Sequence, residues 1–251
     1  MPYGMYISAE GAAAQAQRLE VIANNLANVD TVGFKHDVPT FQARFAEAIQ
    51  QGLAQEQDKS INDLGGGVKV IDVETDFSTG RLQQTGNDFD LAIAGNGFFQ
   101  VAGDDGQTYL TRAGNFTLDP QGRLVTQTGG QTVLDQSGSE IVLAPSQPWS
   151  ISPDGFLSQA GSTYVLGLLQ PQSLGDLVKV GSNQFRSLGT VAPVPLPERQ
   201  VRQGYLEMSG ANPVQQMMAM IETTRAFEAN TRMIQTQDSM TDALVSRVLQ
   251  A

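Results

Sequence analysis

The sequence predicts an α+β fold, in which a discontinuous coiled-coil domain of the two terminal helices accompanies a central, mainly antiparallel β domain. Small and apolar residues alternate at spacings of four and three between Met5 and Leu26. No Gly or Pro interrupts the sequence from Val214 to Ala251. Between these ends, short alternating runs are separated by residues that favour turns.

The N-terminal segment has the apolar seam of a helix that pairs with another helix. The seam consists of Met5, Ala9, Ala12, Ala16, Leu19, Ala23 and Leu26, widened by Ile22. Asn, Asp, Thr and Gly gather between Asn28 and Gly33, so the helix should end there. Residues 1–35 are assigned to the N-terminal helix of the terminal-helix domain. An Ala-rich seam buries little area, so this helix needs closely packed neighbours.

The next segment, residues 36–75, shows less patterning and includes Gly65-Gly66-Gly67. We expect an extended connection there. A β domain is expected over 76–200. Residues 89–94 alternate in polarity, 97–101 form a second apolar run, and turn signals such as Asp119-Pro120-Gln121-Gly122 then recur between short β-prone runs.

The C-terminal segment, 201–251, predicts a long helix. Asn212 can cap it, Pro213 suits the first helical position, and Gln215 can complete a capping box. A helix over 213–249 would be about 55 Å long at ~1.5 Å per residue. Its apolar residues lie on more than one side, so it should contact several partners. Repeated contacts that do not close would build a filament.

Composition excludes several function classes. The chain has 251 residues, a net charge of −11, no Cys and one His, which excludes disulfides, thiolate metal sites and multi-His sites. Residues 1–50 carry −2 and 201–251 carry −1, which leaves −8 for 51–200. The β domain should therefore face water. An acidic surface disfavours nucleic acid. Neither a cleaved signal peptide nor a membrane-inserted helix is expected.

No catalytic, cofactor or metal site emerges from the residues, and the chain is not expected to be an enzyme. His36 is the one histidine base, and a solvated residue after a helix is its simpler interpretation. Gly95-Asn96-Gly97 lacks the third glycine of a dinucleotide fingerprint. An alternative function is a β domain that binds glycan or peptidoglycan. It needs an exposed aromatic platform, for which Trp149 and Tyr164 are the candidate pair, although a core or hairpin position is the simpler interpretation of both.

Four blocks resemble the flagellar basal-body rod and hook family. The first, 23–35, contains Asn24, Asn25, Asn28, Thr31, Gly33 and Phe34. The central block runs from residue 85 through Gly97, Phe98 and Phe99 to residue 101, and the third is the hairpin at 109–116. The C-terminal block runs from residue 204 through Arg225 and Glu228 to Asn230. Within this family the chain is most similar to the proximal rod subunit, in its length, its Met-x-x-Gly-x-Tyr start and its Arg-x-Phe-Glu form. The distal rod subunit is a close second.

The resemblance implies a structural subunit without cofactor. In that family the terminal helices pair into an inner-tube domain, and subunits stack into a rod that transmits torque to the hook. The implied partners are the chain itself, other rod and hook subunits and the flagellar type III export apparatus. The implied location is the basal body, outside the cytoplasm. A distal rod or hook subunit is the alternative. The residues expected to pack helices in the assembly are Ala9, Ala12, Ala16, Leu19, Ile22, Ala23, Leu26, Met220, Ile221, Phe227 and Ile234.

Overall fold

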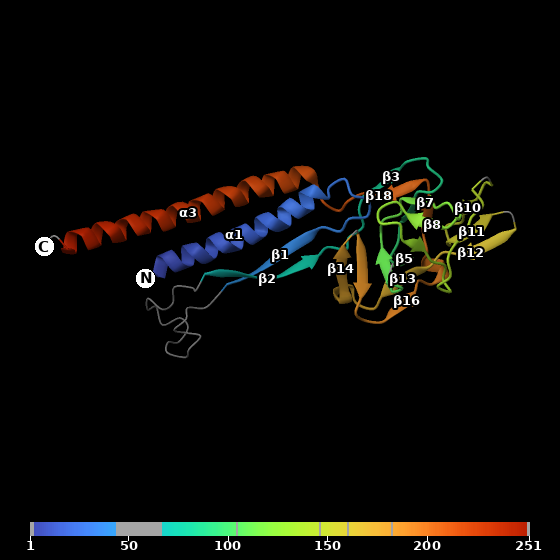
Figure 1. Cartoon of the computed structure of the whole chain (residues 1–251), viewed down its shortest axis with the longest axis horizontal. Coiled ribbons are helices and arrows are strands. Elements are labelled where there is room, and N and C mark those ends of the chain that lie inside the picture. The colour runs from blue at the N-terminus through green and yellow to red at the C-terminus, as the bar shows by residue number, and fades with distance from the viewer. Residues whose placement is uncertain are drawn as a thin grey trace. The chain divides into compact units, whose positions relative to one another are not determined.

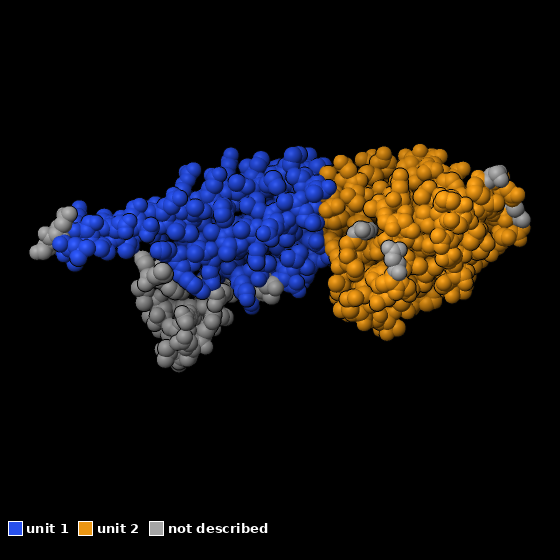
Figure 2. All heavy atoms as spheres, in the orientation of Figure 1, with its two compact units in different colours: residues 1–27, 37–76, 212–251 blue, residues 28–36, 77–211 orange. Residues whose placement is uncertain are grey.

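The computed structural model describes residues 3–43, 67–103, 105–145, 147–159, 161–181 and 183–249. The chain divides into two compact units (Figure 2). Unit 1, the helical unit, consists of residues 1–27, 37–76 and 212–251, and unit 2, the β unit, of residues 28–36 and 77–211. These bounds differ from the expected division, because residues 28–36 and 201–211 belong to the β unit and residues 37–76 to the helical unit. The α+β class is confirmed.

Two antiparallel helices dominate the helical unit. Helix α1 (Tyr3–Ala27) lies beside helix α3 (Pro213–Leu249) (Figure 1). Helix α1 ends directly before Asn28, as the sequence predicts. Oδ1 of Asn212 accepts hydrogen bonds from the backbone N–H of Val214 at 3.0 Å and of Gln215 at 3.3 Å, so the predicted cap is confirmed. Neither described helix contains a stretch long and apolar enough to span a bilayer.

An antiparallel hairpin packs against α1 in the same unit. Its strands are β1 (Asp37–Ala43) and β2 (Val68–Thr75), with a register shift between Thr40 and Phe41. These strands occupy the two ends of the segment expected to be an extended connection, and residues 44–66 lie outside the described part of the chain. The side chain of Asn25 bonds both backbone groups of Asp37, at 2.8 and 2.9 Å. This pair of bonds fixes the start of β1 to the last turns of α1.

The β unit contains short strands joined by antiparallel pairing. They are β3 (Leu82–Gln84), β4 (Leu91–Ile93), β5 (Phe98–Ala102), β6 (Thr108–Thr111), β7 (Phe116–Leu118), β8 (Leu124–Thr126), β9 (Thr132–Val133), β10 (Ser150–Ile151), β11 (Phe156–Gln159), β12 (Ser162–Val165), β13 (Leu168–Pro171), β14 (Leu177–Gly181), β15 (Gln184–Ser187), β16 (Val191–Pro193), β17 (Val201–Gln203) and β18 (Tyr205–Glu207). Two 3-10 turns, η2 (Leu174–Asp176) and η3 (Leu196–Glu198), lie between them. A nine-stranded sheet has the path β14-β15-β6-β5-β9-β8-β7, with β13 and β16 attached through β5.

Strand β5 separates two apolar clusters of the β unit. Phe99 belongs to the main core, where its ring meets that of Phe116 edge-on with centroids 5.1 Å apart. Phe98 points to the other side of the sheet and packs with Phe185 in a smaller cluster. Adjacent residues on a strand face opposite sides, so this Phe-Phe pair supplies both clusters at once.

Candidate functional site

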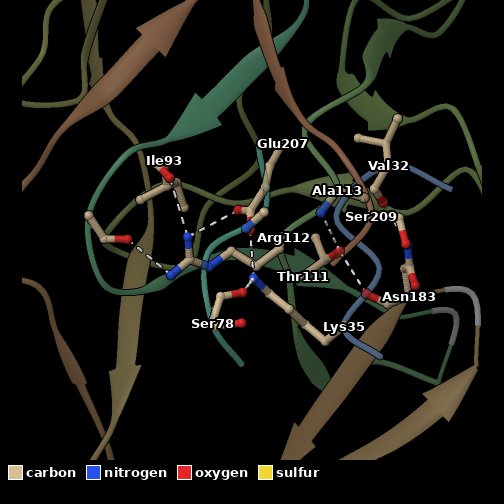
Figure 3. Close-up of polar contacts among 12 residues, drawn as sticks. Val32, Lys35, Ser78, Ile93, Thr111, Arg112, Ala113, Asn183, Glu207 and Ser209 are labelled. Atoms are coloured by element: carbon tan, nitrogen blue, oxygen red, sulfur yellow. Dashed lines mark hydrogen bonds and ion pairs between the residues drawn. The ribbon is translucent and has the colours of Figure 1, made fainter. Parts of the chain in front are cut away.

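A buried carboxylate at the end of β18 is the most unusual polar feature of the β unit. Glu207 is 1% exposed, and Lys35 Nζ lies 2.5 Å from its Oε1 atom (Figure 3). Arg112 Nη1 lies 3.2 Å from its Oε2 atom. The backbone N–H of Gly80 donates a further hydrogen bond of 2.8 Å to Oε1. Two cations and one amide thus hold this carboxylate away from water.

Both cations also donate to backbone carbonyls, while Arg112 Nε is buried without a hydrogen-bond partner among the described residues. Lys35 Nζ donates to the carbonyl of Ser78 at 2.7 Å, and Arg112 donates to those of Ile93 and Gly95 at 3.3 and 3.0 Å. The Arg112 guanidinium also lies 5.1 Å from the centroid of the Phe98 ring. Burial lowers the pKa of Arg112, and the nearby Glu207 carboxylate opposes that change. We call Lys35, Arg112 and Glu207 the buried ion cluster.

The buried ion cluster joins segments that are far apart in sequence. Lys35 lies just before the chain re-enters the helical unit at residue 37, and Gly80 follows its return after residue 76. Glu207 precedes the last crossing, after residue 211. One carboxylate therefore ties three crossing segments to one another inside the β unit. These contacts restrain the backbones of the three segments relative to one another.

The loop that carries Lys35 is fitted closely into the β unit. Gly33 has a φ of +68°, and its N–H donates to the Glu207 carbonyl at 2.7 Å. A Cβ at this position would lie 2.5 Å from the backbone nitrogen of Ala113, so a residue larger than glycine would have to move the backbone. This glycine thus allows the loop to approach within van der Waals contact of the backbone at Arg112 and Ala113, directly after β6.

The other side of the same loop is held by the hairpin of β14 and β15. Lys179 Nζ donates to the carbonyl of Lys35 at 2.6 Å and lies 4.7 Å from the centroid of the Phe34 ring. Asn183 Nδ2 donates to the carbonyl of Val32 at 2.6 Å (Figure 3). Phe34 is buried, and its carbonyl accepts from the N–H of Gly210 at 2.9 Å. Residues 32–35 are therefore held from both sides.

The remaining motif residues take separate positions. Asn25 is buried in the helical unit, Asn24 is exposed, and Thr31 donates from its hydroxyl to Asn28 Oδ1 at 3.2 Å. Gly97 has a φ of +109° and comes so close to Val194 that a Cβ would lie 2.7 Å from Cγ2 of that residue.

On α3, two of the three motif residues face solvent. Arg225 and Glu228 are exposed, and Glu228 lies 3.8 Å from Arg232 in a surface ion pair. Asn230 is half-buried against α1. The family motif residues therefore do not converge on one site.

The residues expected to pack helices divide by exposure. Ile22 is buried. The half-buried members are Ala12, Ala16, Leu19, Leu26, Met220, Phe227 and Ile234. The exposed members are Ala9, Ala23 and Ile221. The structure thus leaves part of this set accessible on the helical unit.

The buried ion cluster was not predicted from the sequence. Lys35, Arg112 and Glu207 each stand inside a family block, and a charged residue among apolar and glycine residues is the signal that could have indicated burial. His36 is half-buried near Gly210, outside the cluster.

The two residues proposed as an aromatic platform lie against the main core. Trp149 packs on Phe89, with ring centroids 5.5 Å apart, and Tyr164 is half-buried. Neither forms an exposed stacking surface.

Three family profiles match the chain in order. The profile described as flagella basal body rod protein matches residues 5–35, and the one described as flagellar hook protein FlgE/F/G D1 domain matches residues 92–159. The profile described as flagellar basal body rod FlgEFG protein C-terminal matches residues 202–247. The first covers most of α1 and the loop 28–35 that follows it. The last begins in β17 and runs through most of α3.

Curated relatives match over nearly their whole length. The flagellar basal-body rod protein FlgF of Caulobacter vibrioides is 35% identical over 254 residues, which cover 99% of this chain and 98% of the relative. FlgG of Bacillus subtilis is 34% identical, with 91% and 92% covered. FlgG of Caulobacter vibrioides is 32% identical, with 94% and 95% covered.

Proposed function

The chain belongs to the family of flagellar basal-body rod proteins, and on that basis we propose that it polymerises through its paired terminal helices into the axial drive shaft of the flagellum. Its role as a rod subunit is structural and not enzymatic. In the assembled rod, the helical unit forms the inner tube and the β unit forms the outer layer. Torque then passes along the stacked subunits toward the hook.

The observation that supports polymerisation is the exposed apolar surface of α3. Ten large apolar side chains of this helix are between 48% and 80% exposed: Val214, Met217, Met218, Ile221, Met233, Met240, Leu244, Val245, Val248 and Leu249. Large apolar side chains exposed in this number along one helix indicate an interaction surface. Neighbouring copies of the chain would cover it.

One feature supports the mechanical role of the β unit. Net charge does not support its outer position, because residues 28–36 and 77–211 carry −4, whereas the helical unit carries −7. The buried ion cluster ties three crossing segments together. A junction held this way resists separation of the segments when the subunit is loaded.

Within the rod we assign the chain to the proximal position. Identity to FlgF of Caulobacter vibrioides is 35%, against 32% for FlgG of the same organism. Its partners are other copies and other rod and hook subunits. We further propose that the flagellar type III export apparatus delivers the chain to the basal body, outside the cytoplasm, without a cleaved signal peptide.

A charge in the helix seam tests this function. Leu26 is half-buried on α1, so Leu26→Asp should leave the β unit folded and abolish rod completion and swimming. Gln17→Asp places the same charge at an exposed position of the same helix and serves as the matched control. Normal motility of the Leu26→Asp strain, with the variant present at normal levels, would refute the proposal.

A further inference from the structure

Glycines of α1 face amides of α3 at two levels of the helix pair. A Cβ built on Gly11 would lie 3.2 Å from Asn230 Nδ2, and one built on Gly4 would lie 2.7 Å from Gln237 Nε2. Gly4 and Gly11 are one heptad apart, as are Asn230 and Gln237. The two contacts therefore belong to a single antiparallel register of the helices.

The buried side of α3 contains a polar row beside an apolar row. Thr223, Asn230 and Gln237 follow one another at heptad spacing and are buried or half-buried. Met220, Phe227 and Ile234 form the apolar row with the same spacing, and all three are half-buried. An apolar row of regular spacing packs similarly after a shift of one heptad, so it defines the register poorly.

The polar row destabilises the helix pair, which indicates that its role is to make the pairing specific. The Oε1 atom of Gln237 is shielded from solvent and has no hydrogen-bond partner among the described residues. A buried polar atom without a partner destabilises a fold, yet single polar residues in helix seams select one register over others. Gly11, inside a helix, is likewise unfavourable for helix formation.

We propose that the glycine–amide contacts Gly4–Gln237 and Gly11–Asn230 set the register in which the terminal helices pair. A slip of one heptad moves the partner by about 10 Å at ~1.5 Å per residue and breaks both contacts, so that one glycine at most faces an amide. One of the two possible slips places Leu244 opposite Gly4 and Arg18 opposite Asn230. This inference rests on the proposed function, because rod subunits can stack only if every copy presents the same helix register.

Disulfide trapping tests the register in the full chain, which contains no native Cys. The in-register pair is Gly4→Cys with Gln237→Cys, and the shifted pair is Gly4→Cys with Leu244→Cys. We expect the in-register pair to oxidise at least tenfold faster, because a disulfide requires Cβ atoms about 3.5–4.5 Å apart. The ratio of the two rates measures how strictly the register is kept.

Gly11→Leu, made in both Cys backgrounds, fills the space that Asn230 occupies and should lower that ratio at least fivefold. Ala27→Leu adds the same side chain at an exposed position of α1 and should leave the ratio unchanged. Asn230→Ala removes the amide without adding bulk and should also lower the ratio. If Gly11→Leu abolishes helix pairing, the rate ratio measured in Asn230→Ala tests the inference instead.

An unchanged ratio in Gly11→Leu and Asn230→Ala would overturn the inference. Equal rates for the two Cys pairs in the otherwise unchanged chain would overturn it as well. Motility failures are scored separately, in the Leu26→Asp strain. Loss of the proposed function with an intact rate ratio would therefore leave the register inference standing.

Discussion

The two units of this chain bury apolar surface to very different extents. In the β unit, Leu91, Phe99 and Val133 are fully shielded from solvent within a continuous core. In the described part of the helical unit, Ala14 and Ile22 are the only apolar side chains classed as buried, and Asn25 and Thr223 are buried beside them. Exposed apolar residues are concentrated on α3 of that unit.

This difference indicates which unit can be stable by itself. A continuous core supplies most of the free energy that offsets chain entropy, and the β unit has one. The helical unit pairs two long helices through small residues, amides and an apolar row that stays half-buried, so the pairing buries little apolar area. Its stability should therefore depend on neighbouring subunits, as expected of the part that polymerises.

The largest expected effect is on the β unit through Glu207→Ala. Removing this carboxylate leaves Lys35 and Arg112 buried without a countercharge, so the unit should lose about 3–5 kcal/mol of unfolding free energy. Urea unfolding followed by Trp149 fluorescence measures the loss, because this single Trp lies in the β unit. Glu140→Ala, which removes a 3.4 Å surface pair with Arg123, is the control and should cost less than about 1 kcal/mol. Equal losses for the two variants would contradict the account.

A smaller loss is expected for Gly33→Ala. This residue has a positive φ, and its Cβ would meet the backbone near Ala113, so strain and contact together should cost about 1–3 kcal/mol. The same urea titration detects it. Gly130→Ala is a matched control, because Gly130 also has a positive φ but has open space at the Cβ position. The difference in unfolding free energy between the two variants measures the effect of the close approach between Gly33 and the backbone at Ala113.

On the helical unit, surface changes should alter assembly and not the stability of the monomer. Replacing both Leu244 and Val248 of α3 by Ser removes exposed apolar groups, so the unfolding free energy should change by less than about 0.5 kcal/mol. Rod completion should fail in the same variant. A clear drop in monomer helicity by circular dichroism would show instead that these residues already pack within the subunit.

The smallest effect is a pH dependence in the β unit. Partial desolvation acts to raise the pKa of Asp119, but hydrogen bonds and charge from Arg123 outweigh it and hold the pKa below the ordinary 3.8. This carboxyl therefore stabilises the fold above that pH and loses its contribution as the pH falls toward its folded-state pKa. Asp119→Asn should show a shallower loss of stability between about pH 5 and about pH 3.

The sequence was sufficient where short-range patterns decide the structure. The cluster from Asn28 to Gly33 marks the end of α1, and Asn212-Pro213 marks the start of α3. It was insufficient where partners are far apart. Lys35 and Glu207 are 172 residues apart, and no local pattern identifies them as a pair. The hairpin of β1 and β2 was not predicted for a related reason, because residues 44–67 separate its two strands in the sequence.

Three of the expected packing residues, Met220, Phe227 and Ile234, form the apolar row of α3. The sequence could not identify Gly4 and Gly11 as the residues of α1 that face Gln237 and Asn230, because a glycine contributes no hydrophobic signal. The contacts of a glycine become visible only once the partner helix is in place.

Hydrogen exchange on the full chain, before and after polymerisation, tests the central claim most directly. In the dilute monomer, amides of α1 and α3 should exchange at least a hundredfold faster than those of β4 and β5, because few apolar contacts protect them. Polymerisation should slow exchange in both helices and leave β4 and β5 unchanged. Helices as protected in the monomer as β5, with no further slowing in the polymer, would contradict the claim that the helical unit depends on its neighbours.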